Sequence, residues 1–398
     1  MSERLIPMTK RLFRELGSRQ RPGVRRSSGA FERVMAFEKL QRAGALIRFA
    51  HPAGSLRLSI SAALRFQNAL TLMMIASLII AARPVQAQWE QLPPLPEPNG
   101  GFVCGQLEHY LEVAGGTKWQ MHDLIIAGGT NWEGEKKNWL TTVRAFDTNG
   151  KAWRRLEDLE EPAAYALPLQ MSDVFGFAGG TSGSQTLKAM VLFDGLKPLR
   201  HAMPKLPTTM VLAAGGILAN GRLVFAGGTD DAANLAGVTQ ATHSLANGQV
   251  TRLADYPGKP FATAASAVVG EELLVFGGMN YDEVNKAAVN TAEAYAFSPE
   301  KNVWRKLKPL AAPTRGLTAI TLDENHIYIA GGYREDFTAE AVIYDVKADS
   351  YRKAIPLPYA AMVGLVKMGE HVYCLGGEDK KQSRTDKFFR IPVVELLK

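Results

Sequence analysis

The feature that most constrains this chain is an apolar run that ends in a pair of glycines and recurs six times. The runs read LIIAGG, FGFAGG, LVFAGG, LVFGG, IYIAGG and VYCLGG, with spacings of 51, 48, 50, 54 and 45 residues. A period near 50 is typical of a repeat in which each unit forms one four-stranded blade of a β-propeller. We interpret each run as a strand covered on both faces by neighbouring blades. The glycines then let the backbone leave the strand with φ values that a Cβ would oppose.

The period and the glycine-pair signature resemble the kelch repeat, and weaker signals complete the blade. Outer strands are expected around Trp153 and Trp304, and residues 107–122 are interpreted as an insertion. The segment after residue 87 opens with another such strand, around Trp89, while the last repeat has no outer strand of its own. We therefore expect the N-terminal strand to complete the last blade, which would close the ring and cover its edges. The predicted fold is all-β: a six-bladed kelch-type propeller over 88–398, with minimal helix.

Residues 1–87 have the composition of a basic leader followed by a secretory signal. An Arg-rich stretch to Arg65 precedes the 14-residue apolar run ALTLMMIASLIIAA and a small-x-small site ending at Ala87. The run is shorter than the roughly 18 apolar residues of a membrane-spanning helix. We expect cleavage near Ala87 and a periplasmic or secreted protein. An uncleaved membrane anchor is the alternative, and the start codon could lie downstream of Met1.

The net charge of +7 belongs to this leader. Residues 1–87 hold 15 Lys and Arg against 4 Asp and Glu, out of 46 and 39 in the whole chain, which leaves the remainder near −4. No basic stripe with interleaved aromatic residues follows residue 88, so the sequence indicates no nucleic-acid partner. Cys104 and Cys374 lack metal-site spacing; a bridge between them is an alternative to two independent buried thiols, which we favour.

The last glycine-pair turn, GGEDKKQSRTD, is the strongest candidate site. Glu378 follows the glycines directly, and Arg384 stands six residues later, where the returning strand is expected to start. In a propeller, loops of this kind surround one mouth of the central channel, so both side chains could face it. A solvated charged turn is the competing interpretation.

The loop after the first glycine pair, TNWEGEKKNW, is the second candidate. It places Glu133, Lys136 and Lys137 between Trp132 and Trp139. Aromatic faces beside cations and carboxylates suit a polar, partly apolar ligand such as a sugar acid. We select Trp132 and Lys136 as substrate-binding candidates; a solvated turn is again the alternative.

These two loops, with the segment LPPLPEPNGGF, resemble the bacterial N-acetylneuraminate epimerase (sialic acid mutarotase) family. The resemblance covers residues 88–398 and is to the circularly permuted branch, in which the Glu/Arg blade comes last. It implies that Glu378 is the general base and that Arg384 binds the substrate. Mutarotation takes a proton from the anomeric hydroxyl and delivers one to the ring oxygen, and a forked cation suits the sugar's carboxylate. No metal or other cofactor is implied.

The chain departs from the family pattern in two blades. Phe261 stands where the family usually has an arginine, and blade two offers Ala163, Ala164 and the hydroxyl of Tyr165 where a cation is expected. Arg315, at the equivalent place in blade five, could compensate, although a surface turn is an equal interpretation. Because of these departures, the resemblance to the family does not specify which acidic sugar is the substrate.

Other chemistry finds little support. The histidines after residue 88 lack metal-ligand spacing, and there is no nucleophile elbow or phosphate loop. The acidic pairs at 230–231 and 282–283 are interpreted as solvated turns. The leading hypothesis is an isomerase that interconverts anomers of an acidic sugar. The alternative is a non-catalytic kelch propeller that binds a glycan or protein partner outside the cytoplasm.

Overall fold

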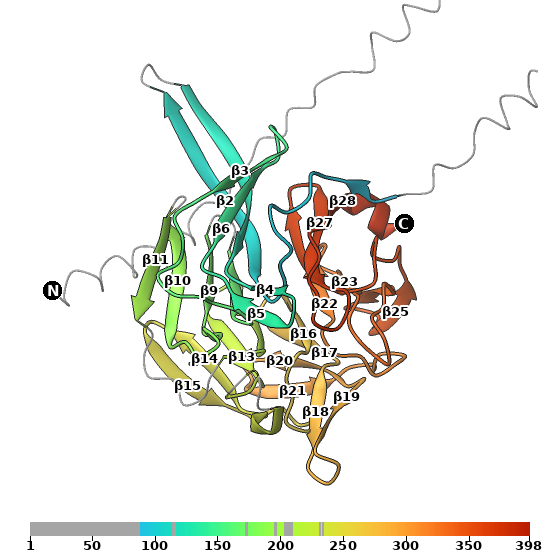
Figure 1. The fold of residues 1–398 in the computed structure, drawn as a ribbon. Coiled ribbons are helices and arrows are strands. Elements are labelled where there is room, and N and C mark those ends of the chain that lie inside the picture. Colours follow the sequence, from blue (N-terminus) through green and yellow to red (C-terminus); the bar gives the residue numbers. More distant parts are fainter. Residues whose placement is uncertain are drawn as a thin grey trace, which may run out of the picture. The chain divides into compact units, whose positions relative to one another are not determined.

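The fold is an all-β propeller of six four-stranded antiparallel sheets, as predicted (Figure 1). The computed structural model describes residues 88–113, 117–171, 174–194, 197–202, 210–230, 232 and 235–398. The predicted leader lies outside these residues, and so do residues 114–116 within the segment interpreted as an insertion. Among the helices of the described part, none has the length and apolar character needed to cross a membrane.

The first three blades follow one another along the chain, each running from the inner to the outer strand. Blade one contains β2 (Val103–Val113), β3 (Thr117–Ala127), β6 (Val143–Asp147) and β7 (Ala152–Arg155); blade two contains β8 (Leu167–Gln170), β9 (Phe175–Ala178), β10 (Ala189–Asp194) and β11 (Lys197–Ala202); blade three contains β12 (Ala214–Ile217), β13 (Leu223–Ala226), β14 (Thr242–Ala246) and β15 (Gln249–Leu253).

The remaining blades repeat this order. Blade four contains β16 (Ala265–Val269), β17 (Glu272–Phe276), β20 (Ala294–Ser298) and β21 (Val303–Lys306); blade five contains β22 (Thr318–Thr321), β23 (His326–Ala330), β24 (Ala341–Asp345) and β25 (Ser350–Lys353); blade six contains β26 (Met362–Met368), β27 (His371–Glu378), β28 (Phe388–Pro392) and β1 (Glu90–Gln91). Short helices occur at η1 (Leu235–Gly237) and α4 (Val393–Leu397).

The ring closes as the sequence predicts. Strand β1 pairs antiparallel with β28, Glu90 opposite Arg390, and so supplies the outer strand that the last repeat lacks. The inner strands contact one another in sequence around the axis, and β26 contacts β2 to complete the circle. Pairing the first strand with the last blade leaves no gap between blades six and one.

The glycine pairs join each blade to the next. All twelve glycines have positive φ. In every pair, the N–H of the second glycine donates to a carbonyl of the following blade. At Gly277 (φ 62°) an added Cβ would lie 2.6 Å from the Thr314 carbonyl oxygen, so a larger residue fits neither the backbone angle nor the space. The last of these bonds, Gly377 N–H to the Asn99 carbonyl at 2.7 Å, closes the ring.

The core consists of six apolar clusters, one at each interface between blades. The strand before each glycine pair contributes side chains to two of these clusters, because its side chains alternate between the two faces of the sheet. In β3, for example, Leu124 and Ile126 pack against blade six, whereas Ile125 and Ala127 pack against blade two. This explains why the repeated runs are apolar without alternation.

The predicted tryptophan strands lie at the outer edge. Trp89, Trp153 and Trp304 each donate an indole N–H to a carbonyl of the preceding blade or the segment beside it. Blade five lacks this tryptophan, and there the hydroxyl of Tyr351 donates to the Lys308 carbonyl at 2.7 Å instead. A different donor thus makes the same kind of contact.

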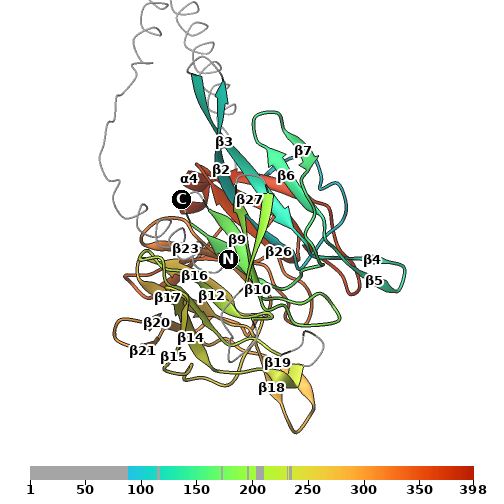
Figure 2. The same ribbon diagram turned by 90° about the vertical axis from the view of Figure 1, so that its left-hand side faces the viewer.

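Extra hairpins project from two blades (Figure 2). One is β4 (Thr130–Glu133) with β5 (Lys136–Trp139); the other is β18 (Met279–Asp282) with β19 (Ala287–Asn290). The segment interpreted as an insertion instead lengthens β2 and β3, which have 11 residues each. Of these features, the β4–β5 hairpin is the one that contributes to the site described below.

Candidate functional site

A cavity of about 270 Å³ lies on the propeller axis, where the inner strands of all six blades begin. Most of its wall is apolar or backbone. Its polar side chains are Tyr165, Thr263, Thr318, Glu378 and Arg384. Arg384 contacts both Tyr165 and Glu378 on one side of the cavity, whereas Leu212, Ala213 and Leu317 belong to another part of the wall. The wall therefore has a charged side and an apolar side.

A belt of backbone hydrogen bonds shapes the mouth of this cavity. Tyr165, Leu212 and Thr263 have left-handed φ values of 56–57°, at the positions that Gly101 and Gly316 occupy in other blades. The N–H of each of these three residues donates to the carbonyl at the equivalent position of the previous blade. The Tyr165 N–H, for example, donates to the Gly101 carbonyl at 2.8 Å. Left-handed φ is costly for residues other than glycine, so the belt fixes side-chain positions that the chain would not adopt by itself.

Glu378 and Arg384 meet on the charged side of the cavity. Glu378 ends β27 and Arg384 lies in the following loop, four residues before β28 rather than at its start. Arg384 Nη1 lies 3.3 Å from Glu378 Oε2, with the arginine side chain 3% exposed and the glutamate 32% exposed. The structure therefore brings together the two residues that the sequence selected as a pair, and leaves the carboxylate accessible.

Arg384 is held by groups from three blades. Its Nε donates to Thr130 Oγ1 at 3.2 Å, its Nη1 to the Ser383 carbonyl at 2.7 Å, and its Nη2 to Tyr165 Oη at 3.3 Å. A guanidinium has five N–H donors, so these bonds leave capacity for a ligand. A buried cation in a fixed fork geometry is suited to bind a carboxylate in a defined orientation.

Tyr165 connects Arg384 with a second cation, Lys137. The Lys137 ammonium donates to Tyr165 Oη at 2.8 Å, and lies 4.4 Å from the ring centroid of Trp139 and 4.9 Å from that of Tyr165. Contact with aromatic faces stabilises the ammonium through cation–π attraction. With Glu378, the cluster contains two cations and one carboxylate, which favours an anionic ligand.

The β4–β5 hairpin explains which of its residues reach this cluster. Trp132 is opposite Lys137 in the strand pairing, and Glu133 is opposite Lys136, so the two pairs face opposite sides. The selected Trp132 thus shares a face with Lys137, and it is not one of the hydrogen-bond partners of Arg384. The selected Lys136 lies on the other, exposed face. The neighbouring Lys137 is the lysine that contacts Tyr165.

Arg315 pairs with residues other than Glu378 and Arg384. Its Nη1 donates to Asn290 Oδ1 at 3.3 Å, and its guanidinium carbon stacks 4.6 Å from the Tyr333 ring centroid. Arg315 does not line the axial cavity, whereas the next residue, Gly316, does. Its role in substrate binding therefore stays a prediction without a contact to the charged cluster.

The departures from the family pattern have structural explanations. Phe261 is 1% exposed and packs in the core against Tyr256, and Ala163 and Ala164 are buried as well. The cavity wall is reached two residues after Phe261, by Thr263, and one residue after Ala164, by Tyr165. Tyr165, whose hydroxyl is noted in the sequence above, was not among the predicted site residues.

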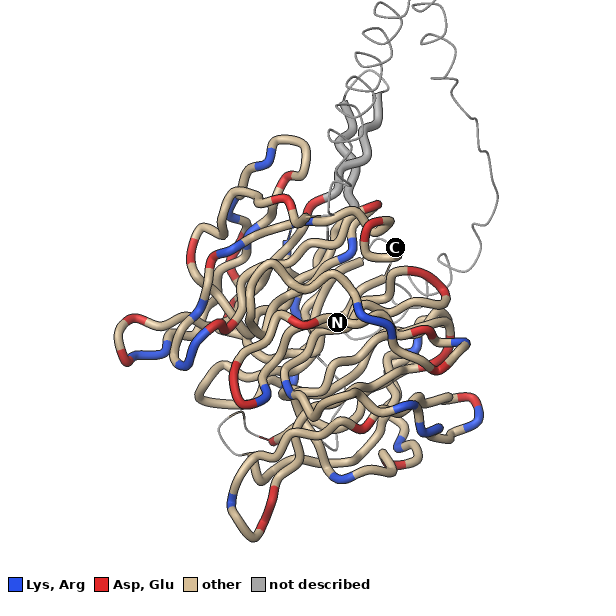
Figure 3. Tube along the Cα trace, turned by 90° about the vertical axis from the view of Figure 1, so that its right-hand side faces the viewer, with Lys and Arg blue, Asp and Glu red and all other residues tan. Residues whose placement is uncertain are grey.

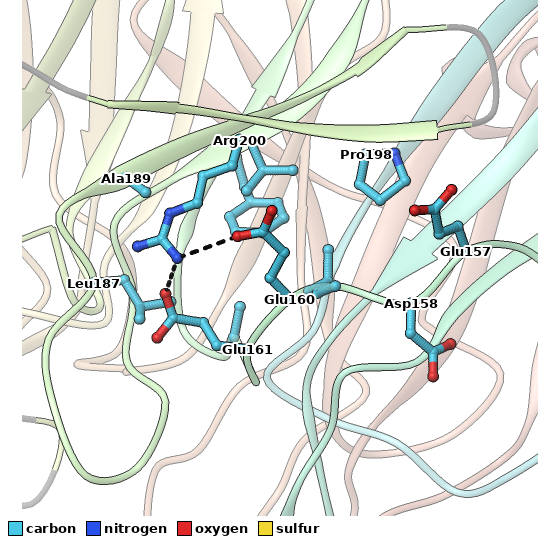
Figure 4. A pocket seen from close by; sticks show the side chains of 12 residues that line it. Glu157, Asp158, Glu160, Glu161, Leu187, Ala189, Pro198 and Arg200 are labelled. Carbon is cyan, nitrogen blue, oxygen red and sulfur yellow. Dashed lines mark ion pairs between the residues drawn. The ribbon is translucent and has the colours of Figure 1, made fainter.

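Among the residues that the structure describes, other titratable groups do not form a comparable site. A smaller cavity of about 70 Å³ lies beside the Arg200–Glu161 ion pair, where Arg200 Nη1 lies 2.5 Å from Glu161 Oε1 (Figure 4). Cys104 and Cys374 are free thiols, and burial raises the pKa of Cys104 to about 12 and that of Cys374 further. Asp282 accepts N–H bonds within its own turn, as expected of a solvated loop.

Charges of both signs are spread over the loops rather than collected in one region (Figure 3). Many form local pairs of opposite sign, such as Lys286 with Glu283 at 2.9 Å. This distribution agrees with the net charge near −4 of the chain after residue 87. In the described part of the chain, the tube in this view shows no long run of Lys and Arg.

Comparisons with known proteins agree with the fold. The Kelch motif matches residues 260–311. Among solved structures, the one titled "Structure of YjhT" aligns with a TM-score of 0.57 and 13% identity, over 75% of this chain and 95% of that chain. The chain therefore has the fold of a kelch-type β-propeller and contains a matching Kelch motif.

The sequence relatives include N-acetylneuraminate epimerases and proteins with other names. The chain is 24% identical over 175 residues to the N-acetylneuraminate epimerase of Salmonella enteritidis PT4, covering 35% of this chain and 46% of the relative. It is 25% identical over 211 residues to spermatocyte protein spe-26 of Caenorhabditis elegans (52% and 36%), and 30% over 129 residues to mouse kelch-like protein 35 (32% and 21%). These matches span less than half of each relative. The predicted resemblance to N-acetylneuraminate epimerases is confirmed; membership of a circularly permuted branch stays a prediction.

Proposed function

We propose that this protein is a mutarotase that interconverts the anomers of N-acetylneuraminic acid or a related acidic sugar. The observation that carries the proposal is the placement of Glu378 and Arg384, 3.3 Å apart, on the wall of the axial cavity. A propeller that only binds a partner has no need for an accessible carboxylate beside a buried arginine inside its channel.

The chemistry follows from these two residues. The Arg384 guanidinium binds the carboxylate of the sugar by charge-assisted hydrogen bonds, which fixes the anomeric carbon near Glu378. Glu378, as a carboxylate, accepts the proton of the anomeric hydroxyl while the bond to the ring oxygen breaks. Closure of the open-chain keto acid from its other face gives the second anomer.

The cavity suits a ligand of this kind. Its volume of about 270 Å³ accommodates a single monosaccharide, and its charge is concentrated on one side. The apolar side, which includes Leu212, Ala213 and Leu317, would contact the less polar face of the ring. Names of relatives support this substrate class, since several are called N-acetylneuraminate epimerase.

The test is NMR of a single sialic acid anomer, freshly dissolved, with and without catalytic amounts of purified protein. We expect equilibration well above the rate in buffer alone. A matched neutral sugar, without the carboxylate, should gain little because it cannot use Arg384. Equilibration no faster than in buffer would favour the alternative, a kelch propeller that binds a glycan or protein partner without catalysis.

Export from the cytoplasm is part of the proposal, and it rests on residues 65–87 of the sequence alone. We expect the mature protein to begin at Gln88, directly before the strand that completes blade six. Sequencing the N-terminus of the protein recovered outside the cytoplasm checks this. A chain that keeps the apolar run 69–82 and sediments with membranes would instead support an uncleaved anchor.

A further inference from the structure

We propose that Tyr165 is the acid that delivers a proton to the ring oxygen as the sugar opens, the partner that Glu378 needs as base. This inference rests on the proposed function, because it assigns the second proton transfer of the same reaction. It concerns a blade-two residue on the cavity wall and not the Glu378 and Arg384 pair.

Hydrogen bonding leaves the Tyr165 proton available. Two cationic groups, Lys137 Nζ at 2.8 Å and Arg384 Nη2 at 3.3 Å, both donate to Tyr165 Oη. A phenol carries one proton of its own, and neither of these bonds uses it. Among the described residues, no protein acceptor takes that proton, and the side chain lines the cavity. A substrate oxygen is then the natural acceptor.

The same two cations stabilise the product of the transfer. When Tyr165 gives up its proton, the phenolate oxygen lies within hydrogen-bond distance of both Lys137 and Arg384. Donors that are already aimed at the atom where negative charge develops need no reorganisation during the reaction. This arrangement would favour Tyr165 over a water molecule as the proton donor.

The backbone places Tyr165 with little freedom. Its N–H donates to the Gly101 carbonyl at 2.8 Å, and its own carbonyl accepts the Leu212 N–H at 3.0 Å. The ring also packs edge-on against Trp139, with centroids 6.0 Å apart. A φ of 57°, costly for an aromatic residue, is thus held by the belt around the channel, so the hydroxyl is positioned before substrate arrives.

Arg384 contacts both of the groups that would exchange protons with the sugar, Glu378 and Tyr165. Its Nη1 is beside Glu378 and its Nη2 is beside Tyr165. A carboxylate bound to this guanidinium would therefore lie next to both. In an acidic sugar of the sialic type, the carboxylate is attached to the anomeric carbon, which carries both the hydroxyl and the ring oxygen.

The complete step conserves protons and electrons. Glu378 takes the anomeric hydroxyl proton, the electrons of that O–H bond form the C=O bond, and the pair of the C–O ring bond moves to the ring oxygen. That oxygen takes the proton of Tyr165. After rotation, the hydroxyl attacks the other face of the ketone and returns its proton to the phenolate, while the former ketone oxygen takes the proton of Glu378.

The first test is Tyr165→Phe, assayed by the same NMR exchange with wild type as reference. We expect kcat to fall by about 10²-fold or more, the usual contribution of a general acid, with KM changed by less than about threefold. Tyr333→Phe, a tyrosine beside Arg315 outside the cavity wall, is the matched control and should keep its rate. A wild-type kcat in Tyr165→Phe, or a change in KM alone, overturns the assignment.

A second variant separates acid from structural roles. Tyr165→Gly suits the left-handed backbone and leaves a space that phenol or benzene can enter. Phenol should restore part of kcat and benzene should not; equal rates with both contradict the acid role. If wild type itself fails to accelerate exchange, the proposed function fails. If wild type is active while the Tyr165 results are negative, only this inference fails.

Discussion

The buried side chain of Arg384 packs directly against the backbone of Gly100, a residue 284 positions earlier in the sequence. A Cβ added to Gly100 would lie 2.6 Å from Arg384 Nε and 3.2 Å from the carbonyl carbon of Gly377. The first glycine of the NGGF segment is therefore part of the arginine's binding pocket. The contact exists only because the N-terminal segment passes between blades six and one.

Gly100→Ala should displace Arg384 and weaken substrate binding. Overpacking of this kind costs about 1–3 kcal/mol, and here part of the strain is relieved by moving the arginine. We expect a rise in KM for the acidic sugar together with a small decrease in the free energy of unfolding, both measured on the purified variant. Gly248→Ala, in the turn between β14 and β15 with nothing within 4 Å and away from the cavity lining, is the control for KM; its left-handed φ of 72° means that it too loses some stability. Unchanged KM in Gly100→Ala would mean that the pocket tolerates the extra methyl group.

Arg384→Gln should affect binding of the acidic sugar more than any other arginine substitution near the channel. Loss of hydrogen bonds to a charged group costs about 2 kcal/mol, or roughly thirtyfold in KM. Arg315→Gln is the matched comparison, because Arg315 contacts Asn290 and Tyr333 and does not line the cavity. Steady-state rates from NMR exchange give both values. Equal effects of the two substitutions would restore Arg315 as a binding residue.

The repeat and its closure could be predicted from sequence because they depend on local chemistry. Glycine pairs with positive φ mark every blade, and a missing outer strand at one end matches a surplus strand at the other. Neither inference needs knowledge of side-chain directions beyond the two-residue period of a strand.

The detail of the site could be predicted only in part. Lys136 and Lys137 are adjacent, and the hairpin register alone determines that Lys137 faces Tyr165. A shift of one residue would exchange the two lysines. Thr130 likewise contacts Arg384 only through ring closure, so no local pattern indicated it.

His243 should make the propeller less stable in mild acid. The ring is buried in β14 and stacks on Phe225 with centroids 5.5 Å apart; burial, and secondarily the charge of Arg252, lower its pKa. The unfolded state then binds a proton near pH 6.5 that the folded state does not, so stability rises with pH through that region and is lost below it.

Urea unfolding between pH 5 and 8 measures this slope. We expect His243→Phe, which preserves the stacked ring, to unfold with a weaker pH dependence than wild type. His371, whose pKa is also lowered by burial, should leave a residual slope. An identical pH profile for His243→Phe and wild type would show that protonation of His243 does not limit acid stability.

The role of Glu378 as base is the central claim. Glu378→Gln preserves the shape of the side chain and its place beside Arg384 but cannot accept a proton as a carboxylate does. Glu133→Gln, the same substitution on the exposed face of the β4–β5 hairpin, controls for the chemical change alone.

The most direct measurement is therefore the exchange rate between sialic acid anomers, by NMR, for wild type, Glu378→Gln and Glu133→Gln at one protein concentration. General base catalysis contributes about 10²–10⁴-fold, so Glu378→Gln should lose at least about 10²-fold while Glu133→Gln keeps the wild-type rate. A Glu378→Gln variant that exchanges the anomers as fast as wild type would contradict the account.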